Sequence, residues 1–201
     1  MTDPNVTETT IVEVTPETTA IVKQEMPDAT DETIAETAAL FEAIKKRATA
    51  EFQAAGELTR EAYLNAVTKA SDAIDENKSI AKDRMKEAVS LIKKESEKNW
   101  LVLDAIKTRA QAQVQDAGEV SREAYLKAVR QAREAVEQNK LVERSRIEQA
   151  VDDIQKQTEK NWHVVVGEIE SLGARLKETA KSAWNSLTAF VEKSRNNGGD
   201  S

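Results

Sequence analysis

The sequence predicts an all-α protein: an elongated antiparallel bundle of long amphipathic helices built from a 62-residue tandem duplication. Three observations lead to this fold class. Apolar side chains recur with a spacing near 3.6 residues over most of the chain, as on the buried face of a helix. All three prolines lie within the first thirty residues, so no residue after them has to break a helix. A long segment also recurs 62 residues further along the chain.

The N-terminal segment differs from the rest in composition and charge. Residues 1–29 are rich in Thr, Glu, Val and Pro and show no helical period. Residues 1–36 carry nine acidic side chains and one lysine, whereas the remainder of the chain is nearly balanced. Such a segment cannot bury enough apolar surface to offset the entropy of ordering it. We expect residues 1–29 to be a disordered acidic tail, acting either as a solvated bristle or as a docking peptide.

The duplicated helical region is expected to cover residues 30–173. Residues 55–78 and 117–140 are identical at fourteen of twenty-four positions, and the tetrapeptide EKNW at 97–100 returns at 159–162. A repeat of this length predicts that one supersecondary unit occurs twice in the fold.

Each copy opens with the residues of a helix–turn–helix. Gly56 and Gly118 suit the left-handed position that ends a helix, and Thr59 and Ser121 are natural N-caps for the helix that follows. Turns are therefore predicted at 56–59 and 118–121. They divide the region into three helices, at about 31–55, 59–117 and 121 to the 170s.

Two interruptions leave the length of these helices open. The apolar stripe is broken at Asn77-Lys78 and again at Asn139-Lys140. Each site is either a bend that folds the chain into shorter bundles or a polar layer within an unbroken helix. Large aromatic side chains fill the seams that alanine leaves thin, and we interpret four of them as structural anchors: Tyr63, Trp100, Tyr125 and Trp162.

The last amphipathic helix is the best candidate for a contact surface. Residues 174–195 place aromatic and aliphatic side chains on one face and basic side chains near the other, and residues 196–201 are expected to be disordered. Such a helix either lies at a lipid interface or packs back on the bundle or on another copy. The possible lipid or partner face consists of Leu176, Trp184, Leu187, Phe190 and Val191.

The residues for catalysis or cofactor binding are missing from the sequence. There is no cysteine, no glycine-rich phosphate loop and no nucleophile–histidine pairing. His163, the only histidine, could pair with Glu159, but two ligands do not make a metal site. We therefore predict no catalytic, cofactor-binding or metal-ligating residues, and a protein that is not an enzyme. The balanced charge of the helical region also argues against nucleic-acid binding.

The alanine-, lysine- and glutamate-rich stripes from Leu40 to Val191, with the duplicated REAYL, NK and EKNW motifs, resemble apolipoprotein-like and late-embryogenesis-abundant-like proteins. That resemblance implies coating of a lipid or particle surface, with a stress-protective role. The residues themselves favour a structural or scaffold protein that self-associates or binds a protein partner through helix–helix contacts. No run of apolar residues is long enough to span a membrane. We expect a cytoplasmic protein, with a position at the periphery of a membrane or particle as the alternative.

Overall fold

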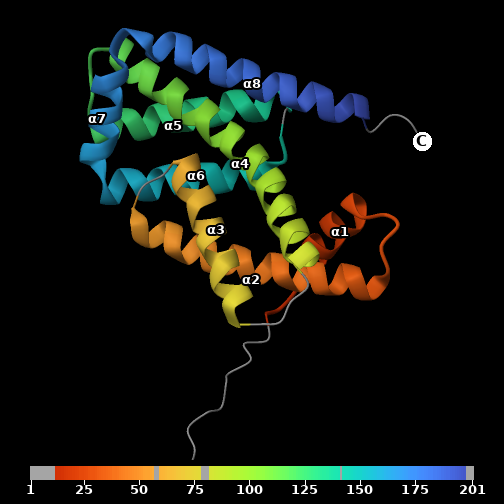
Figure 1. Cartoon of the computed structure of the whole chain (residues 1–201). Coiled ribbons are helices and arrows are strands. Elements are labelled where there is room, and N and C mark those ends of the chain that lie inside the picture. The colour runs from red at the N-terminus through yellow and green to blue at the C-terminus, as the bar shows by residue number, and fades with distance from the viewer. Residues whose placement is uncertain (1–11, 57–58, 78–81, 141, 198–201) are drawn as a thin grey trace, which may run out of the picture. The chain divides into compact units, whose positions relative to one another are not determined.

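The computed structural model describes residues 12–56, 59–77, 82–140 and 142–197. Within these ranges all regular structure is helical (Figure 1), so the predicted all-α class is confirmed. None of the helices in these ranges has an apolar stretch long enough to cross a bilayer. The helices have the following bounds: α1 Pro16–Glu25, α2 Asp31–Ala55, α3 Arg60–Asn77, α4 Lys82–Asp116, α5 Arg122–Gln138, α6 Arg144–Lys160, α7 Trp162–Leu172, the 3-10 turn η1 Gly173–Arg175, and α8 Leu176–Asn197.

Helix α1 corrects the prediction that residues 1–29 form a disordered tail. Thr15 caps α1 by accepting a hydrogen bond from the backbone N–H of Thr18, and Pro16 occupies the first turn, where its missing N–H costs nothing. The Val22 side chain is fully buried in the same core as α2. The short apolar face of this segment therefore orders it by packing on a neighbouring helix. Residues 1–11 of the predicted tail lie outside the described residues.

The helix before each predicted turn ends at a glycine with positive φ. Gly56 has φ 70° and Gly118 has φ 68°, in the left-handed region that lacks a penalty only for glycine. At the second turn the N–H of Gly118 donates to Gln115 O and the N–H of Glu119 donates to Val114 O, at 3.1 and 3.2 Å. These two bonds form a Schellman motif, which satisfies carbonyls at the end of α4.

The helix after each turn begins at a capping hydroxyl. Thr59 Oγ1 accepts a hydrogen bond from the N–H of Ala62 at 3.1 Å, and Ser121 Oγ accepts one from Ala124 at 3.2 Å. Each hydroxyl satisfies one of the backbone donors that the first turn of a helix leaves open. Between Gly56 and Thr59, residues 57–58 lie outside the described residues.

The expectation of two long helices at 59–117 and from 121 to the 170s is wrong. Helix α3 ends at Asn77 and α4 begins at Lys82, while α5 ends at Gln138 and α6 begins at Arg144. Asn77 is thus the last residue of α3 and Asn139-Lys140 follow the end of α5, as the alternative of shorter helices expects; residues 78–81 lie outside the described residues. The last stretch is divided once more, because α6 gives way to α7 at Asn161.

The end of α5 shows a physical cause for the second interruption. Lys140 has φ 50°, the only positive φ among the non-glycine residues that the structure describes. Asn139 Nδ2 donates to Ala135 O at 2.7 Å, and the N–H of Lys140 donates to Glu137 O at 3.0 Å. These two bonds occupy carbonyl oxygens of the last turn of α5, and the chain leaves the helix at Lys140.

The chain divides into two compact units. Unit 1 comprises residues 1–52 and 63–93, and unit 2 comprises residues 53–62 and 94–201. The core of unit 1 draws on α1, α2, α3 and the first part of α4; its buried members include Val22, Ile34, Phe41, Ile44, Val67, Met85, Leu91 and Ile92. Next to this core, Phe52 meets Tyr63 edge-to-face with ring centroids 5.6 Å apart.

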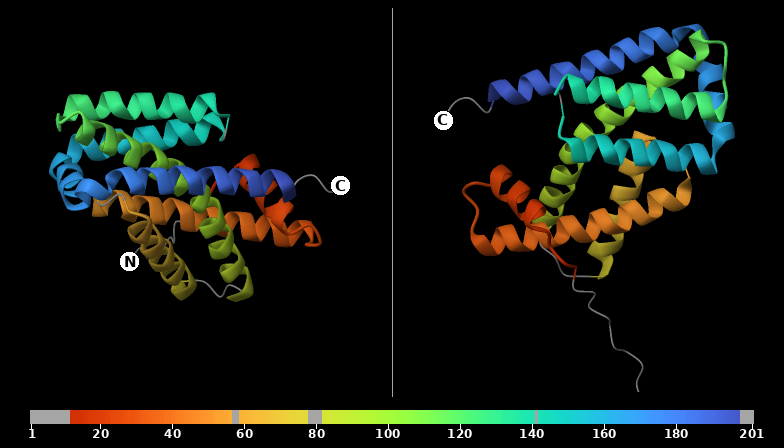
Figure 2. Two further views of the ribbon diagram at one scale, coloured as in Figure 1. Left: turned by 90° about the horizontal axis from the view of Figure 1, so that it is seen from above. Right: turned by 180° about the vertical axis from the view of Figure 1, so that it is seen from behind.

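Unit 2 contains the second part of α4 together with α5, α6, α7, η1 and α8. Figure 2 shows α5 and α6 running side by side in opposite directions, with α7 across one end and α8 extending along the unit. Its buried residues include Trp100, Val102, Ile106, Tyr125, Val129, Ile147, Ile154, Val165, Leu176 and Leu187. Gly173, with φ 47°, ends α7 at the turn into α8. Helix α8 reaches Asn197, so the expected disorder of residues 196–201 is wrong for residues 196–197; residues 198–201 lie outside the described residues.

Candidate functional site: the groove between α4 and α8

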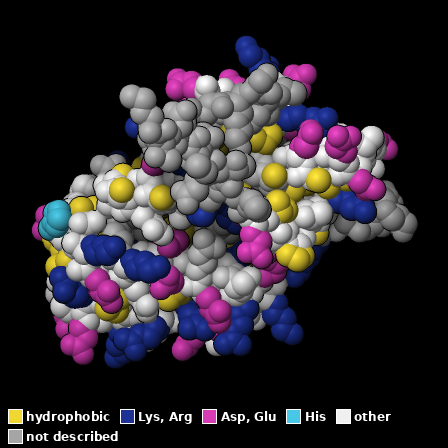
Figure 3. All heavy atoms as spheres, turned by 90° about the horizontal axis from the view of Figure 1, so that it is seen from below, with side chains coloured by type: hydrophobic (Ala, Val, Ile, Leu, Met, Phe, Trp, Pro, Cys, Tyr) yellow, Lys and Arg dark blue, Asp and Glu magenta, His cyan; other side chains and the backbone are white. Residues whose placement is uncertain are grey.

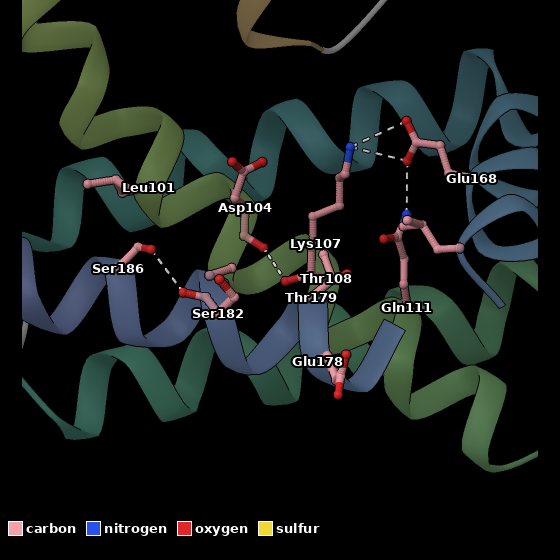
Figure 4. Close-up of a pocket in the computed structure, with 12 residues that line it drawn as sticks. Leu101, Asp104, Lys107, Thr108, Gln111, Glu168, Glu178, Thr179, Ser182 and Ser186 are labelled. Atoms are coloured by element: carbon pink, nitrogen blue, oxygen red, sulfur yellow. Dashed lines mark hydrogen bonds and ion pairs between the residues drawn. The ribbon is translucent and has the colours of Figure 1, made fainter. Parts of the chain in front are cut away.

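A buried polar cluster of unit 2 lies at the contact between α4 and α7. Lys107 and Gln111 are four residues apart and therefore share one face of α4. Lys107 Nζ lies 3.1 Å from Glu168 Oε2 on α7, and Gln111 Nε2 donates to the same oxygen at 2.9 Å (Figure 4). Gln111 is fully buried and Lys107 is only 13% exposed. Because burial makes an unpaired charge costly, each partner depends on the others.

A buried phenol lies within the electrostatic reach of this cluster. Tyr125 is fully buried, and its Oη has no hydrogen-bond partner among the described residues. Burial raises the pKa of Tyr125 far above its ordinary range, and the negative charge of Glu168 raises it further. Tyr125 therefore stays a neutral phenol, and its role is to pack. Its ring centroid lies 5.9 Å from that of Trp162.

Beside this cluster a groove of about 590 Å³ opens between α4 and α8. Short side chains of α8, including Ser182, Ala183 and Ser186, form one wall (Figure 4). Asp104 lines the groove on the α4 side. Its desolvation raises the pKa of this carboxyl, and Glu168 and Glu97 add to the effect against the opposing charges of Lys107 and Arg60.

The charged groups of the groove serve to hold helices together. The Glu168 carboxylate is occupied by an ammonium and an amide, and Lys107 is held in an ion pair. Arg60, at the start of α3, forms an ion pair with Glu97 on α4 in the same unit. The arrangement is that of a clamp between helices.

A second polar clamp joins α6 to α4. Arg146 Nη2 lies 2.9 Å from Glu95 Oε2, and Arg146 Nη1 donates to Asn99 Oδ1 at 2.8 Å. Burial by itself would raise the pKa of Glu95, but the hydrogen bond from Arg146 and the charge of Lys98 lower it overall. In unit 1 Arg84, 62 residues before Arg146, pairs with Glu36 on α2 at 3.4 Å.

The predicted contact face of α8 is covered within unit 2. Leu176 and Leu187 are buried, while Trp184, Phe190 and Val191 are half-buried. The guanidinium carbon of Arg109 lies 5.2 Å from the centroid of the Trp184 ring, a cation–π contact. A smaller cavity of about 280 Å³ remains where Phe190 and Val191 approach Val102 and Arg146.

The predicted anchors and turn residues do not form one site. Trp100 and Tyr125 are buried, whereas Tyr63 and Trp162 are half-buried. Tyr63 belongs to unit 1 and the other three belong to unit 2. Of the turn residues, Gly56 meets Asn161, whose Nδ2 donates to Gly56 O at 2.8 Å.

Sequence reasoning missed both clamps. In the sequence, Lys107 and Gln111 directly follow the apolar residues Ile106 and Ala110. The available sign was therefore a polar pair spaced four residues apart beside the apolar positions of a helix. For the second clamp the sign was an arginine that recurs at positions 84 and 146 of the duplicated segment. His163, considered with Glu159 as a metal ligand, is exposed on α7. Across the described part of the chain, no three His, Cys, Asp or Glu side chains gather as a metal site would require.

Surface charge is mixed. On the face drawn in Figure 3, Lys and Arg side chains alternate with Asp and Glu side chains, and apolar side chains appear between them. Comparison of the chain with protein families, with curated proteins and with solved structures gives no match.

Proposed function

We propose that this chain is a non-enzymatic structural protein that works as a scaffold through helix–helix contacts and self-association. The observation that carries this proposal is the recurrence of helix boundaries at the offset of the sequence repeat. Helices α3 and α5 begin at Arg60 and Arg122, and α4 and α6 begin at Lys82 and Arg144. Both pairs of starts are 62 residues apart, the same offset as that of the repeated segments. The helix boundaries and the sequence repeat thus share one period, which is typical of proteins built from stacked helical units.

The division of helix α4 between the two units also supports a protein built from repeated helical units. The residues of α4 up to Lys93 belong to unit 1 and those from Lys94 belong to unit 2. In repeat proteins each unit is stabilised by its own packing and by its neighbours. A unit that lies at the end of such an array offers helix surfaces to another copy.

The polar interior also favours a structural role. The side chains of Lys107, Gln111 and Glu168 are used in holding α7 to α4, and Arg146 is used in holding α6 to α4. Inter-helix networks of this kind fix the register of a bundle. We place the protein in the cytoplasm as part of the same proposal.

Peripheral lipid binding is the alternative function. It would require α8 to expose Leu176 and Leu187, which unit 2 buries. Self-association of the folded chain needs no such opening, and we therefore favour it.

The test is the solution mass of the full chain over a wide concentration range, measured by light scattering and sedimentation. The expected result is a mass that rises above the 22.2 kDa of one chain as concentration increases. A mass of one chain at every concentration would contradict self-association. Flotation with neutral and anionic vesicles, with helicity followed by circular dichroism, is the second measurement. Recovery of the protein with the vesicles would favour the lipid alternative.

A further inference from the structure

The tetrapeptide Glu-Lys-Asn-Trp occurs twice in unit 2 and has two conformations. At residues 97–100 it lies inside α4, which is continuous from Lys82 to Asp116. At residues 159–162 the helix is interrupted: α6 ends at Lys160, α7 begins at Trp162, and Asn161 has φ −134° and ψ 45°. The same four residues are thus compatible with a straight helix and with a bend. The choice between the two is made by contacts outside the tetrapeptide.

The bend at Asn161 interrupts the helix at a single residue. The N–H of Asn161 still donates to Gln157 O at 2.7 Å, and the N–H of Val164 donates to Asn161 O at 2.9 Å. The side-chain bond from Asn161 to Gly56 O fixes the bent form. Straightening this residue would join α6 and α7 into one helix from Arg144 to Leu172, in the way that α4 continues through Asn99.

Everything after this hinge is held by contacts to the rest of unit 2. The buried apolar side chains of residues 162–197 are Val165, Ile169, Leu176 and Leu187. Polar and cation–π contacts also join this segment to the remainder of the unit: Glu168 with Lys107 and Gln111, Lys177 with Asp116, Trp184 with Arg109, and Arg195 with the carbonyl of Lys140. A second copy of the chain can supply an identical segment to the same surface.

We propose that the interaction surface of this protein is the part of unit 2 that α7 and α8 cover, and that its partner is a second copy of the chain. Two copies exchange residues 162–197, with Asn161 straightened into the helix. Exchange keeps each contact of the interface and replaces a bent hinge by continuous helix, which is why identical elements can swap at low cost. The inference rests on the self-association proposed above and specifies its geometry.

The ion pair between Lys107 and Glu168 allows a direct test. In Lys107→Glu, two carboxylates face each other within one folded chain, and in Glu168→Lys, two ammonium groups do so. In an exchanged dimer of the two variants, the carboxylate introduced at position 107 of one copy meets the ammonium group introduced at position 168 of the other. The second interface of that dimer keeps the native Lys107–Glu168 pair. Mixing therefore relieves both repulsions only if α7 is exchanged.

The two variants are unfolded together, refolded in equal amounts and examined by light scattering, with one of them labelled with ¹⁵N for native mass spectrometry. We expect a species of one labelled and one unlabelled chain, with a dimer dissociation constant roughly tenfold lower than for either variant alone. If neither variant folds by itself, the recovery of helicity on mixing is the readout. The double variant Lys107→Glu/Glu168→Lys restores the ion pair within one chain. Mixed with the native chain, it is expected to show no preference for mixed dimers. Masses in the mixture equal to those of the separate variants, or helicity that does not recover on mixing, would overturn the exchange.

The hinge gives an independent measurement with a matched control. Asn161→Ala removes the bond to Gly56 and places a strong helix former at the bend, so the dimer fraction is expected to rise. Asn99→Ala changes the same residue of the other copy, where the helix is already straight. It removes the hydrogen bond from Arg146 but touches neither the hinge nor residues 162–197, so it should leave the solution mass unchanged. An equal response of the two variants would contradict the hinge.

The two proposals fail separately. If the native chain self-associates but the charge variants form no mixed species, exchange is wrong and the scaffold proposal stands. If the mixed species forms while the native chain remains single at every concentration, the capacity for exchange is real and the scaffold proposal falls.

Discussion

Asn161 Nδ2 donates a hydrogen bond to the backbone carbonyl of Gly56, 2.8 Å away and 105 residues earlier in the chain. This bond joins the turn between α2 and α3 to the bend between α6 and α7, both within unit 2. A β-carbon added at Gly56 would lie 3.3 Å from Asn161 Nδ2, so the contact leaves little room for a side chain. Asn161 thus depends on a glycine that the turn also needs for its positive φ.

The first prediction concerns Gly56→Ala and its matched control Gly118→Ala. Both glycines have nearly the same positive φ, which costs an alanine about 1–2 kcal/mol. A β-carbon at Gly118 meets no atom within 4 Å, whereas one at Gly56 crowds Asn161. In urea denaturation of the full chain, Gly56→Ala is expected to destabilise unit 2 more than Gly118→Ala. Equal losses would show that the Asn161 contact does not matter.

The second prediction is a stabilising substitution at the end of α5. Lys140 holds φ 50°, which glycine adopts freely, and its carbonyl contact to Arg195 is a backbone contact that a substitution retains. Lys140→Gly should raise the free energy of unfolding by about 1 kcal/mol. Lys127→Gly, at an exposed position inside the same helix, should lower it by about 1 kcal/mol. Chemical denaturation measures both, and a loss of stability in Lys140→Gly would contradict the assignment.

The third prediction separates a buried arginine from an exposed one. Arg146 is 15% exposed and bonds Glu95, Asn99 and Glu143, whereas Arg144 is 77% exposed and pairs with Glu148. Arg146→Ala removes the closer ion-pair partner of the half-buried Glu95 carboxylate, leaving Lys98 at 3.4 Å, and should cost about 2–3 kcal/mol. Arg144→Ala should change stability by less than about 0.5 kcal/mol. Urea denaturation of the two variants beside the native chain measures both changes.

The pH dependence of these two variants provides a further check on the clamp. Because the pKa of Glu95 is lowered in the folded protein, its contribution is present above the ordinary carboxyl pKa of 4.5 and is lost as pH falls through the folded value. Native protein and Arg144→Ala should therefore lose more stability on acidification than Arg146→Ala. Parallel pH profiles for all three would count against the Arg146–Glu95 pair.

The fourth prediction concerns the phenol of Tyr125. Its Oη is buried without a partner among the described residues, so Tyr125→Phe should leave stability at neutral pH unchanged or slightly higher. The folded pKa is raised above the ordinary value of 10.0, which means that stability is retained below pH 10.0 and falls as pH rises above it. Tyr125→Phe removes that part of the alkaline loss. Circular dichroism melts between neutral and alkaline pH measure it.

Tyr63→Phe is the comparison for this variant. Burial also raises the pKa of Tyr63, but Tyr63 is half-buried and belongs to unit 1. The alkaline loss should therefore be reduced less by Tyr63→Phe than by Tyr125→Phe. The opposite order would contradict the difference in burial.

The fold class and the two glycine turns could be predicted from the order of residues alone. Both features depend on local physics: the 3.6-residue period of apolar side chains, the freedom of Gly56 and Gly118 at positive φ, and the capping hydroxyls of Thr59 and Ser121. Such properties act over a few neighbouring residues, and they can be read without knowing what the helices pack against.

The lengths of the helices and the partners of their polar groups depend instead on long-range packing. Residues Pro16–Glu25 form a helix because Val22 packs in the core of unit 1, although the composition of this segment predicted disorder. The clamps of Lys107 with Glu168 and of Arg146 with Glu95 join residues 61 and 51 positions apart, a distance at which local periodicity carries no information. The tetrapeptide Glu-Lys-Asn-Trp shows this division most directly, since it is straight in α4 and bent between α6 and α7. The bend lies where Asn161 reaches Gly56 and Trp162 packs against Tyr125, contacts that only the folded chain brings together.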